Sequence, residues 1–222
     1  MLTNFLNKGI QLNIFELKAL KNLEGSCANK ANLEVIDYDK VKEKIYSLMN
    51  GPGNRLKFNQ PKSCDALKIL PAQFRLDFIE IKGIKDFCDN LQEKAKIEAD
   101  EKIEAQVQKF NLENKIEQSL DLFKLLLQIT QFEVNNTVKE EILNNALKKY
   151  IVVIDEEIEE DYAKQIAVSL DFLSTASNYK NEVIIKLQES IDGIETVKIS
   201  KPVLMSHSKI DQYYEGIGSA VS

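Results

Sequence analysis

Charged residues stand at the ends of two apolar runs in residues 63–83, where they are candidates for catalysis or metal binding. Asp65 precedes the first run, and Glu80 and Lys82 close the second run, two positions apart. Side chains on a strand point alternately to opposite faces, so Glu80 and Lys82 would share a face. The segment therefore predicts two carboxylates and a lysine at one end of a strand pair.

An antiparallel hairpin is the element that must bring these residues together. Residues 67–70 and 76–82 are the expected strands, joined by a turn at residues 71–74. In the register that the chemistry of the faces favours, the facing pairs are Asp65 and Glu80, Leu67 and Phe78, and Ile69 and Leu76. The turn has no Asn-Gly or Asp-Gly signal, and a slip by one residue would separate the two carboxylates.

Two carboxylates on neighbouring strands, about 5 Å apart at their Cβ atoms, suit a hard divalent cation such as Mg²⁺ or Mn²⁺. Such a cation lowers the pKa of bound water and stabilises charge on a phosphoryl oxygen. Lys82 would hold the attacking water or help to deprotonate it. A second interpretation stays open, in which Glu80 and Lys82 are a solvated pair on an exposed face and Asp65 is an acid at the start of a strand.

The order of Asp65, a hairpin and then Glu80-Ile81-Lys82 resembles the PD-(D/E)XK nuclease superfamily, including its uncharacterised bacterial and phage-associated members. The resemblance covers about residues 37–155, and Cys64 stands where the pattern has proline. It implies an α/β (α+β) fold with a restriction-endonuclease-like mixed central sheet flanked by helices, and a long helical insertion after the third strand.

The same resemblance implies roles for individual residues. Asp65 and Glu80 would bind Mg²⁺ or Mn²⁺, and Lys82 would orient or activate water for phosphodiester hydrolysis. Glu43 is an additional candidate, because a helix-borne acid faces the site in some members of the superfamily; the alternative is a Glu43 that faces solvent.

Composition places limits on the class of protein. The chain has 222 residues and 44% hydrophobic content, enough for one core without staples. Its three cysteines are odd in number and form no C-x-x-C, which argues against a disulfide framework and a zinc ribbon. No apolar run has the length of a membrane span and no secretion leader is recognisable, so we expect a soluble, cytoplasmic protein.

The net charge of −6 argues against broad nucleic-acid binding, which depends on Lys and Arg. The local distribution matters more, and seven basic residues are expected close to the site: Arg55, Lys57, Lys62, Lys68, Arg75, Lys82 and Lys85. The single histidine, His207, disfavours HNH-type and His-zinc chemistry and is expected at the surface. No Walker A loop or G-x-G-x-x-G fingerprint is present, so no nucleotide cofactor is expected.

The expected organisation is an N-terminal cap segment (1–36), a nuclease-like core (37–155) that includes a helical region (84–149), a C-terminal helical extension of the same domain (156–215) and a flexible tail (216–222). The hydrophobic periodicity predicts further elements. These are a helix at 41–49 with an Asp N-cap, strands at 55–59, 150–154 and 195–200, a core helix at 120–132, and helices at 161–177 and 180–190.

Two functions follow as hypotheses. In the first, the protein is a metal-dependent nuclease that hydrolyses DNA phosphodiester bonds. In the second, a catalytically silent nuclease-like fold is a protein-binding or regulatory module that uses the charged helices after Ile84. Those helices form either a projecting arm or a long solvated helix across the domain, and the exposed stripe, with the need to cut two strands, favours a homodimer.

Overall fold

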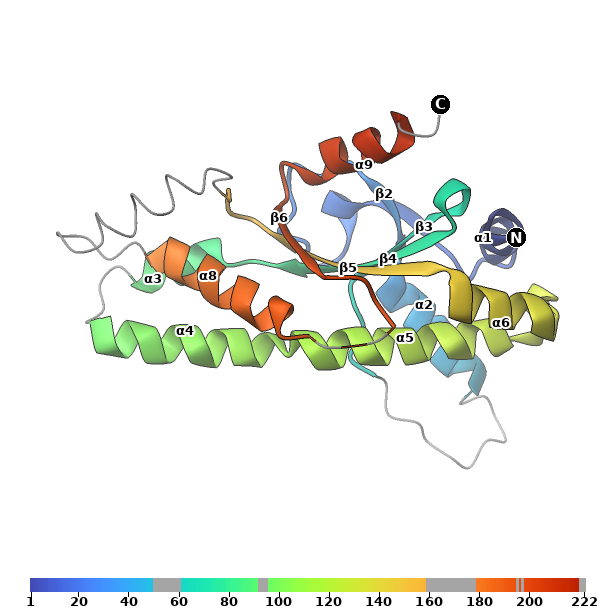
Figure 1. The fold of residues 1–222 in the computed structure, drawn as a ribbon, viewed down its shortest axis with the longest axis horizontal. Coiled ribbons are helices and arrows are strands. Elements are labelled where there is room, and N and C mark those ends of the chain that lie inside the picture. The colour runs from blue at the N-terminus through green and yellow to red at the C-terminus, as the bar shows by residue number, and fades with distance from the viewer. Residues whose placement is uncertain (50–60, 92–95, 159–178, 195, 197, 220–222) are drawn as a thin grey trace.

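A computed structural model describes residues 1–49, 61–91, 96–158, 179–194, 196 and 198–219. These residues form a mixed α/β fold around an open six-stranded sheet, in which the strands follow one another in chain order (Figure 1). The strands are β1 (Leu17–Ala19), β2 (Glu34–Asp37), β3 (Ala66–Leu70), β4 (Arg75–Lys82), β5 (Leu147–Ile154) and β6 (Val203–Ser206). Neighbours from β1 to β4 are antiparallel, whereas β4, β5 and β6 are parallel.

The helices lie between and around these strands. They are α1 (Leu2–Gln11), α2 (Tyr38–Met49), α3 (Lys85–Leu91), α4 (Lys96–Phe110), α5 (Leu112–Gln128), α6 (Asn136–Asn145), α8 (Tyr179–Asp192) and α9 (Ile210–Ser219), with single 3-10 turns η1 (Leu20–Asn22), η2 (Pro71–Gln73) and η3 (Thr130–Phe132). None of the helices in the described part of the chain has the length and apolar character needed to cross a membrane.

The β3–β4 hairpin has the predicted register. Leu67 faces Phe78 and Ile69 faces Leu76, with the single turn η2 between the strands. Phe74 closes the turn with a φ of 48°, so the connection uses a left-handed residue in place of an Asn-Gly pair. The register is therefore the one that the chemistry of the two faces predicted.

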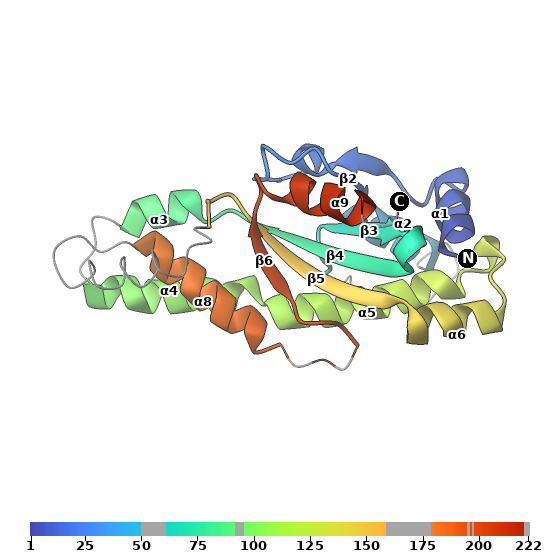
Figure 2. The same ribbon diagram turned by 45° about the horizontal axis from the view of Figure 1, so that its top comes forward.

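Both faces of the sheet are covered, so β4 and β5 are buried along almost their whole length (Figure 2). One face carries Phe78, Tyr150 and Val152 and packs against the larger group of helices, with α5 beneath the strands. The opposite face carries Ile79 and Ile151 and packs against α9 and the segment between β1 and β2. The continuous apolar run at the end of β5 confirms the prediction of a strand buried on both sides.

The helical region after β4 is divided at Asn111, whose φ of 52° ends α4 and begins α5. The helix α5 buries Ile116, Phe123 and Leu126, which confirms a core helix here, although it begins before residue 120 and ends at Gln128. By contrast α4 continues beyond the strands, where it packs against α8, which also packs against α3 (Figure 1). The predicted helix at 180–190 is confirmed as α8.

Other expectations differ from the structure or lie outside it. The predicted strand at 195–200 is wrong: residues 198–200 are turn and coil, and β6 begins after Pro202, which has no N–H for the sheet. Residues 216–219, expected in a flexible tail, belong to α9. Residues 1–36, expected to be a cap, contribute β1 and most of β2. The predicted strand at 55–59 and helix at 161–177 lie outside the described residues.

Candidate functional site

Glu80 and Lys82 share one face of β4 and bond to each other, as the alternation predicts. Lys82 Nζ donates a hydrogen bond to Glu80 Oε1 and a second one, 3.2 Å long, to the carbonyl oxygen of Ile81. Nζ also lies 5.4 Å from the ring centroid of Phe110, within cation–π range. The Glu80 side chain is fully buried and Lys82 is only 13% exposed, so the interpretation as a solvated surface pair is wrong.

Asp65 directly precedes β3 and reaches across to β4. Its Oδ2 accepts a hydrogen bond from the backbone N–H of Ile81 at 2.6 Å. The ladder of the hairpin begins with the pair Ala66 and Ile79, so one more step in the same register places Asp65 opposite Glu80. The structure therefore brings Asp65, Glu80 and Lys82 together at one end of the hairpin.

Lys115 of α5 is a fourth member of this site that the sequence did not reveal. Its Nζ donates to Glu80 Oε1, the same oxygen that Lys82 contacts. In the sequence, Lys115 is a charged residue on a helical stripe whose other members are expected in the core. In the structure, Leu112, Ile116 and Ser119 of α5 are all buried. That stripe shows only that Lys115 points toward the sheet, and its partner depends on how α5 lies across the strands.

Hydrogen bonds at the beginning of β3 fix α5 in this position. Ser119 Oγ accepts from the N–H of Cys64 at 2.7 Å, and the carbonyl oxygen of Ser119 accepts from the hydroxyl of Tyr38 at 2.9 Å. Gln118 Oε1 accepts from the N–H of Lys62 at 2.6 Å. The turn of α5 next to Lys115 is thereby tied to the residues that lead into Asp65.

Two buried polar atoms in this neighbourhood have no hydrogen-bond partner within the described part of the chain: Glu80 Oε2 and the hydroxyl of Tyr150. Tyr150 lies on β5 on the same face as Glu80, and burial raises the pKa of its hydroxyl, with smaller effects from Cys64, Glu80 and Asp65. Unpaired buried polar groups are costly, and in proteins they are commonly completed by water or an ion. Glu80 thus has one oxygen held by two lysines and one buried oxygen without a hydrogen-bond partner among the described residues.

The pKa shifts follow from burial and from the two neighbouring carboxylates. Burial raises the pKa of Glu80, and the charge of Asp65 raises it further, against the effects of Lys82 and Lys115. Burial also raises the pKa of Asp65 against the same two lysines. For Lys115, burial lowers the pKa, but the charge and hydrogen bond of Glu80 outweigh it and raise the value to about 12. The carboxylates therefore occupy surroundings that favour additional positive charge.

Glu43 lies on α2 and borders the same region as Asp65. Both residues line a cavity of about 270 Å³, together with Asp37 and Asp39. The Glu43 side chain is more than half exposed and pairs with Lys40 at 2.9 Å. The structure thus places Glu43 at the edge of the site and gives it no contact with Asp65 or Glu80.

Two of the basic residues expected near the site lie elsewhere. Arg75 and Lys68 belong to the opposite face of the hairpin, where Arg75 forms a bidentate pair with Asp77 and Lys68 donates to the carbonyl oxygen of Glu34. His207, expected at the surface, is buried directly after β6. Arg55 and Lys57 lie outside the described residues.

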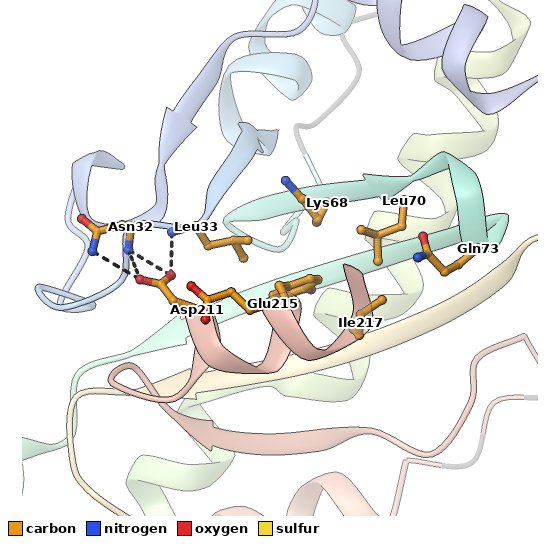
Figure 3. Close-up of a pocket in the computed structure, with 9 residues that line it drawn as sticks. Asn32, Leu33, Lys68, Leu70, Gln73, Asp211, Glu215 and Ile217 are labelled. Carbon is orange, nitrogen blue, oxygen red and sulfur yellow. Dashed lines mark hydrogen bonds between the residues drawn. The ribbon is translucent and has the colours of Figure 1, made fainter. Parts of the chain in front are cut away.

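A larger cavity, of about 500 Å³, lies on that opposite face between α9, β3 and the β1–β2 segment (Figure 3). Asp211 of α9 reaches across it and accepts hydrogen bonds from the N–H groups of Asn32 and Leu33, at 2.7–3.0 Å. This carboxylate therefore attaches α9 to the β1–β2 segment, and the candidate site remains the cluster at Glu80.

A divalent cation fits the side chains at Glu80. No group of three or more His, Cys, Asp or Glu residues gathers as a metal centre within the described ranges. Mg²⁺, however, takes one or two carboxylates and completes its shell with water and phosphate oxygens. Asp65 and Glu80 supply that number of hard oxygen ligands, and none of the described residues donates a hydrogen bond to Glu80 Oε2.

In comparisons with known proteins, no family model, curated protein or solved structure matches this chain.

Proposed function

We propose that this protein is a metal-dependent nuclease of the PD-(D/E)XK type that hydrolyses DNA phosphodiester bonds at the site formed by Asp65, Glu80 and Lys82. One observation carries the proposal: the three side chains meet at one end of the β3–β4 hairpin, and a buried oxygen of Glu80 has no hydrogen-bond partner among the residues that the structure describes. An ion pair with a purely structural role would not leave a buried carboxylate oxygen unpaired.

The residues have separate roles in this proposal. Asp65 and Glu80 would hold Mg²⁺ or Mn²⁺, which when bound lowers the pKa of water and neutralises charge on the phosphoryl group. Lys82 would release Glu80 Oε1 and donate a hydrogen bond to the attacking water, positioning it in line with the phosphorus–oxygen bond that breaks. Ile81 carbonyl and the Phe110 ring would keep its ammonium group near the site during this exchange.

Positive charge flanks the site despite the net charge of −6. Lys62 and Lys85 are exposed, and each lies three positions from a site residue, Asp65 or Lys82. Phosphate contacts of this kind supply most of the sequence-independent affinity for DNA. They support DNA as the substrate class without implying that a base sequence is read.

The test is cleavage of supercoiled plasmid and of single-stranded DNA in Mg²⁺ and in Mn²⁺. The wild type is expected to cut at least one of these substrates, and Glu80→Gln and Asp65→Asn are expected to lose 100-fold or more of the rate. Glu117→Gln, a matched change at an exposed position of α5, should retain full activity. A wild type that cuts neither substrate with either ion, or a Glu80→Gln variant that cuts normally, would refute the proposal.

A second function is favoured by a different observation. The two carboxylates and the two lysines of the site balance in charge without any cation, as in a buried network that only stabilises a fold. In that case the protein is a catalytically silent binding module, and α4 with α8 would provide the contact surface. The Mg²⁺-dependent cleavage assay separates the two functions, because a silent site gives no difference between wild type and Glu80→Gln.

A further inference from the structure

Glu80 is held by two lysines on one oxygen, and the lysine on α5 differs from the lysine on β4 in its other contacts. Lys82 has further interactions with Ile81 and Phe110. Lys115 approaches from a separate element and donates to Glu80 Oε1. If Lys82 leaves Glu80 during a reaction, Lys115 is the donor that remains on the carboxylate.

The location of Lys115 at the start of α5 needs an explanation in itself. The first turn of a helix carries the positive end of the macrodipole, so a lysine there is disfavoured. Lys115 is the fourth residue of α5, and its side chain is only 18% exposed. Both unfavourable effects are offset by the buried carboxylate of Glu80.

The backbone of α5 holds Lys115 rigidly toward Glu80. The carbonyl oxygen of Lys115 accepts from Ser119 Oγ at 2.7 Å, and that same hydroxyl oxygen accepts from the N–H of Cys64, next to Asp65. One turn of the helix is therefore bonded to the Glu80 carboxylate through the ammonium group and to the backbone next to Asp65 through Ser119.

Building on the proposed function, we infer that Lys115 is a positioning residue for the cation. By holding Oε1, it fixes the rotation of the Glu80 carboxylate so that Oε2 is presented to the ion, and it frees Lys82 to act on water. Lys115 touches neither the substrate nor the reacting atoms in this role. The alternative is a simple counter-charge, and it predicts the opposite effect, because removing a positive charge next to the site would tighten cation binding.

The experiment measures Mn²⁺ binding to the full-length protein by electron paramagnetic resonance, without DNA. Lys115→Met is expected to weaken binding at least tenfold, whereas Lys115→Arg, which retains a charged donor, should stay within about threefold of wild type. Lys124→Met changes an exposed lysine of the same helix and should bind as wild type. In DNA cleavage, Lys115→Met should need more Mn²⁺ for half-maximal rate and approach the wild-type rate when Mn²⁺ is saturating.

Folding is checked by circular dichroism, and Lys115→Gln replaces Lys115→Met in the same comparison if the latter does not fold. Equal or tighter Mn²⁺ binding by either variant overturns the inference while the nuclease proposal stands, provided that the wild type binds and cuts. A wild type that neither binds Mn²⁺ nor cuts DNA overturns both. A loss of cleavage in Lys115→Met that saturating Mn²⁺ does not restore also overturns the positioning role.

Discussion

The hydroxyl of Ser119 should be one of the most sensitive single groups in the protein, because it is the acceptor for the N–H that precedes Asp65. Ser119 is fully buried, and its Oγ lies 2.7 Å from the nitrogen of Cys64. Ser119→Ala leaves this N–H buried without a partner, at a cost of about 1–3 kcal/mol. Alanine returns about 0.5 kcal/mol through its higher helix propensity. The expected net loss of unfolding free energy is about 1.5 kcal/mol.

For a chain of this length a loss of that size lowers Tm by about 3–6 °C. Urea unfolding followed by circular dichroism should show a lower midpoint with an unchanged m value. Ser47→Ala is the matched control, since Ser47 is helical and exposed on α2, and its Tm should stay equal or rise slightly. Equal unfolding midpoints for Ser119→Ala and Ser47→Ala would show that the Cys64 N–H does not depend on this hydroxyl, and the argument for a rigid α5 would fail.

Two further predictions concern the opposite face of the sheet and the thiols. Tyr214→Phe removes the hydroxyl that donates to buried Asp77 at 2.7 Å, and urea unfolding should show a loss of about 1.5–3 kcal/mol; an unchanged midpoint would mean that this hydrogen bond adds no net stability. Burial, with a smaller effect of the Asp155 charge, raises the pKa of Cys27 from 9.0 to about 11. Its thiolate fraction at pH 8 then falls about 100-fold, so iodoacetamide should label Cys27 slowly in the folded protein and rapidly in urea, and equal rates would contradict the pKa shift.

The hairpin and its charged end were predictable because they depend on local rules. Strand alternation fixes which of Asp65, Glu80 and Lys82 share a face, and the apolar partners fix the register. The structure confirms the pairing of Leu67 with Phe78, which follows from that pattern. The same rules failed at residues 195–200, where β propensity predicted a strand but the sheet takes the residues after Pro202.

Lys115 and the opposite face were not predictable for a different reason. The contact between Lys115 and Glu80 joins α5 to β4 across tertiary packing, and nothing in the spacing of the two residues encodes it. Likewise the apolar alternation of the hairpin does not predict that Arg75 forms an ion pair with Asp77 beneath α9. The number of basic residues near the site in the sequence therefore overestimated the positive charge of the site, because Arg75 and Lys68 lie on the opposite face of the hairpin.

The charge balance of the site gives the two candidate functions opposite consequences for Glu80. If no cation binds, Lys82 and Lys115 offset the burial of Glu80 and the charge of Asp65, so replacing one lysine leaves the buried carboxylate with a single charged partner and should cost about 3 kcal/mol, the lower end of the range for a broken buried pair. If a divalent cation binds, its charge also stabilises the buried Glu80 carboxylate. Mn²⁺ should then restore part of the stability that is lost when Lys82 or Lys115 is replaced. Thermal unfolding of Lys82→Met with and without Mn²⁺ therefore shows whether a cation binds at the site, and it needs no substrate. A Tm that Mn²⁺ raises in the wild type and in this variant supports the nuclease, and a Tm that Mn²⁺ leaves unchanged in both supports the silent fold.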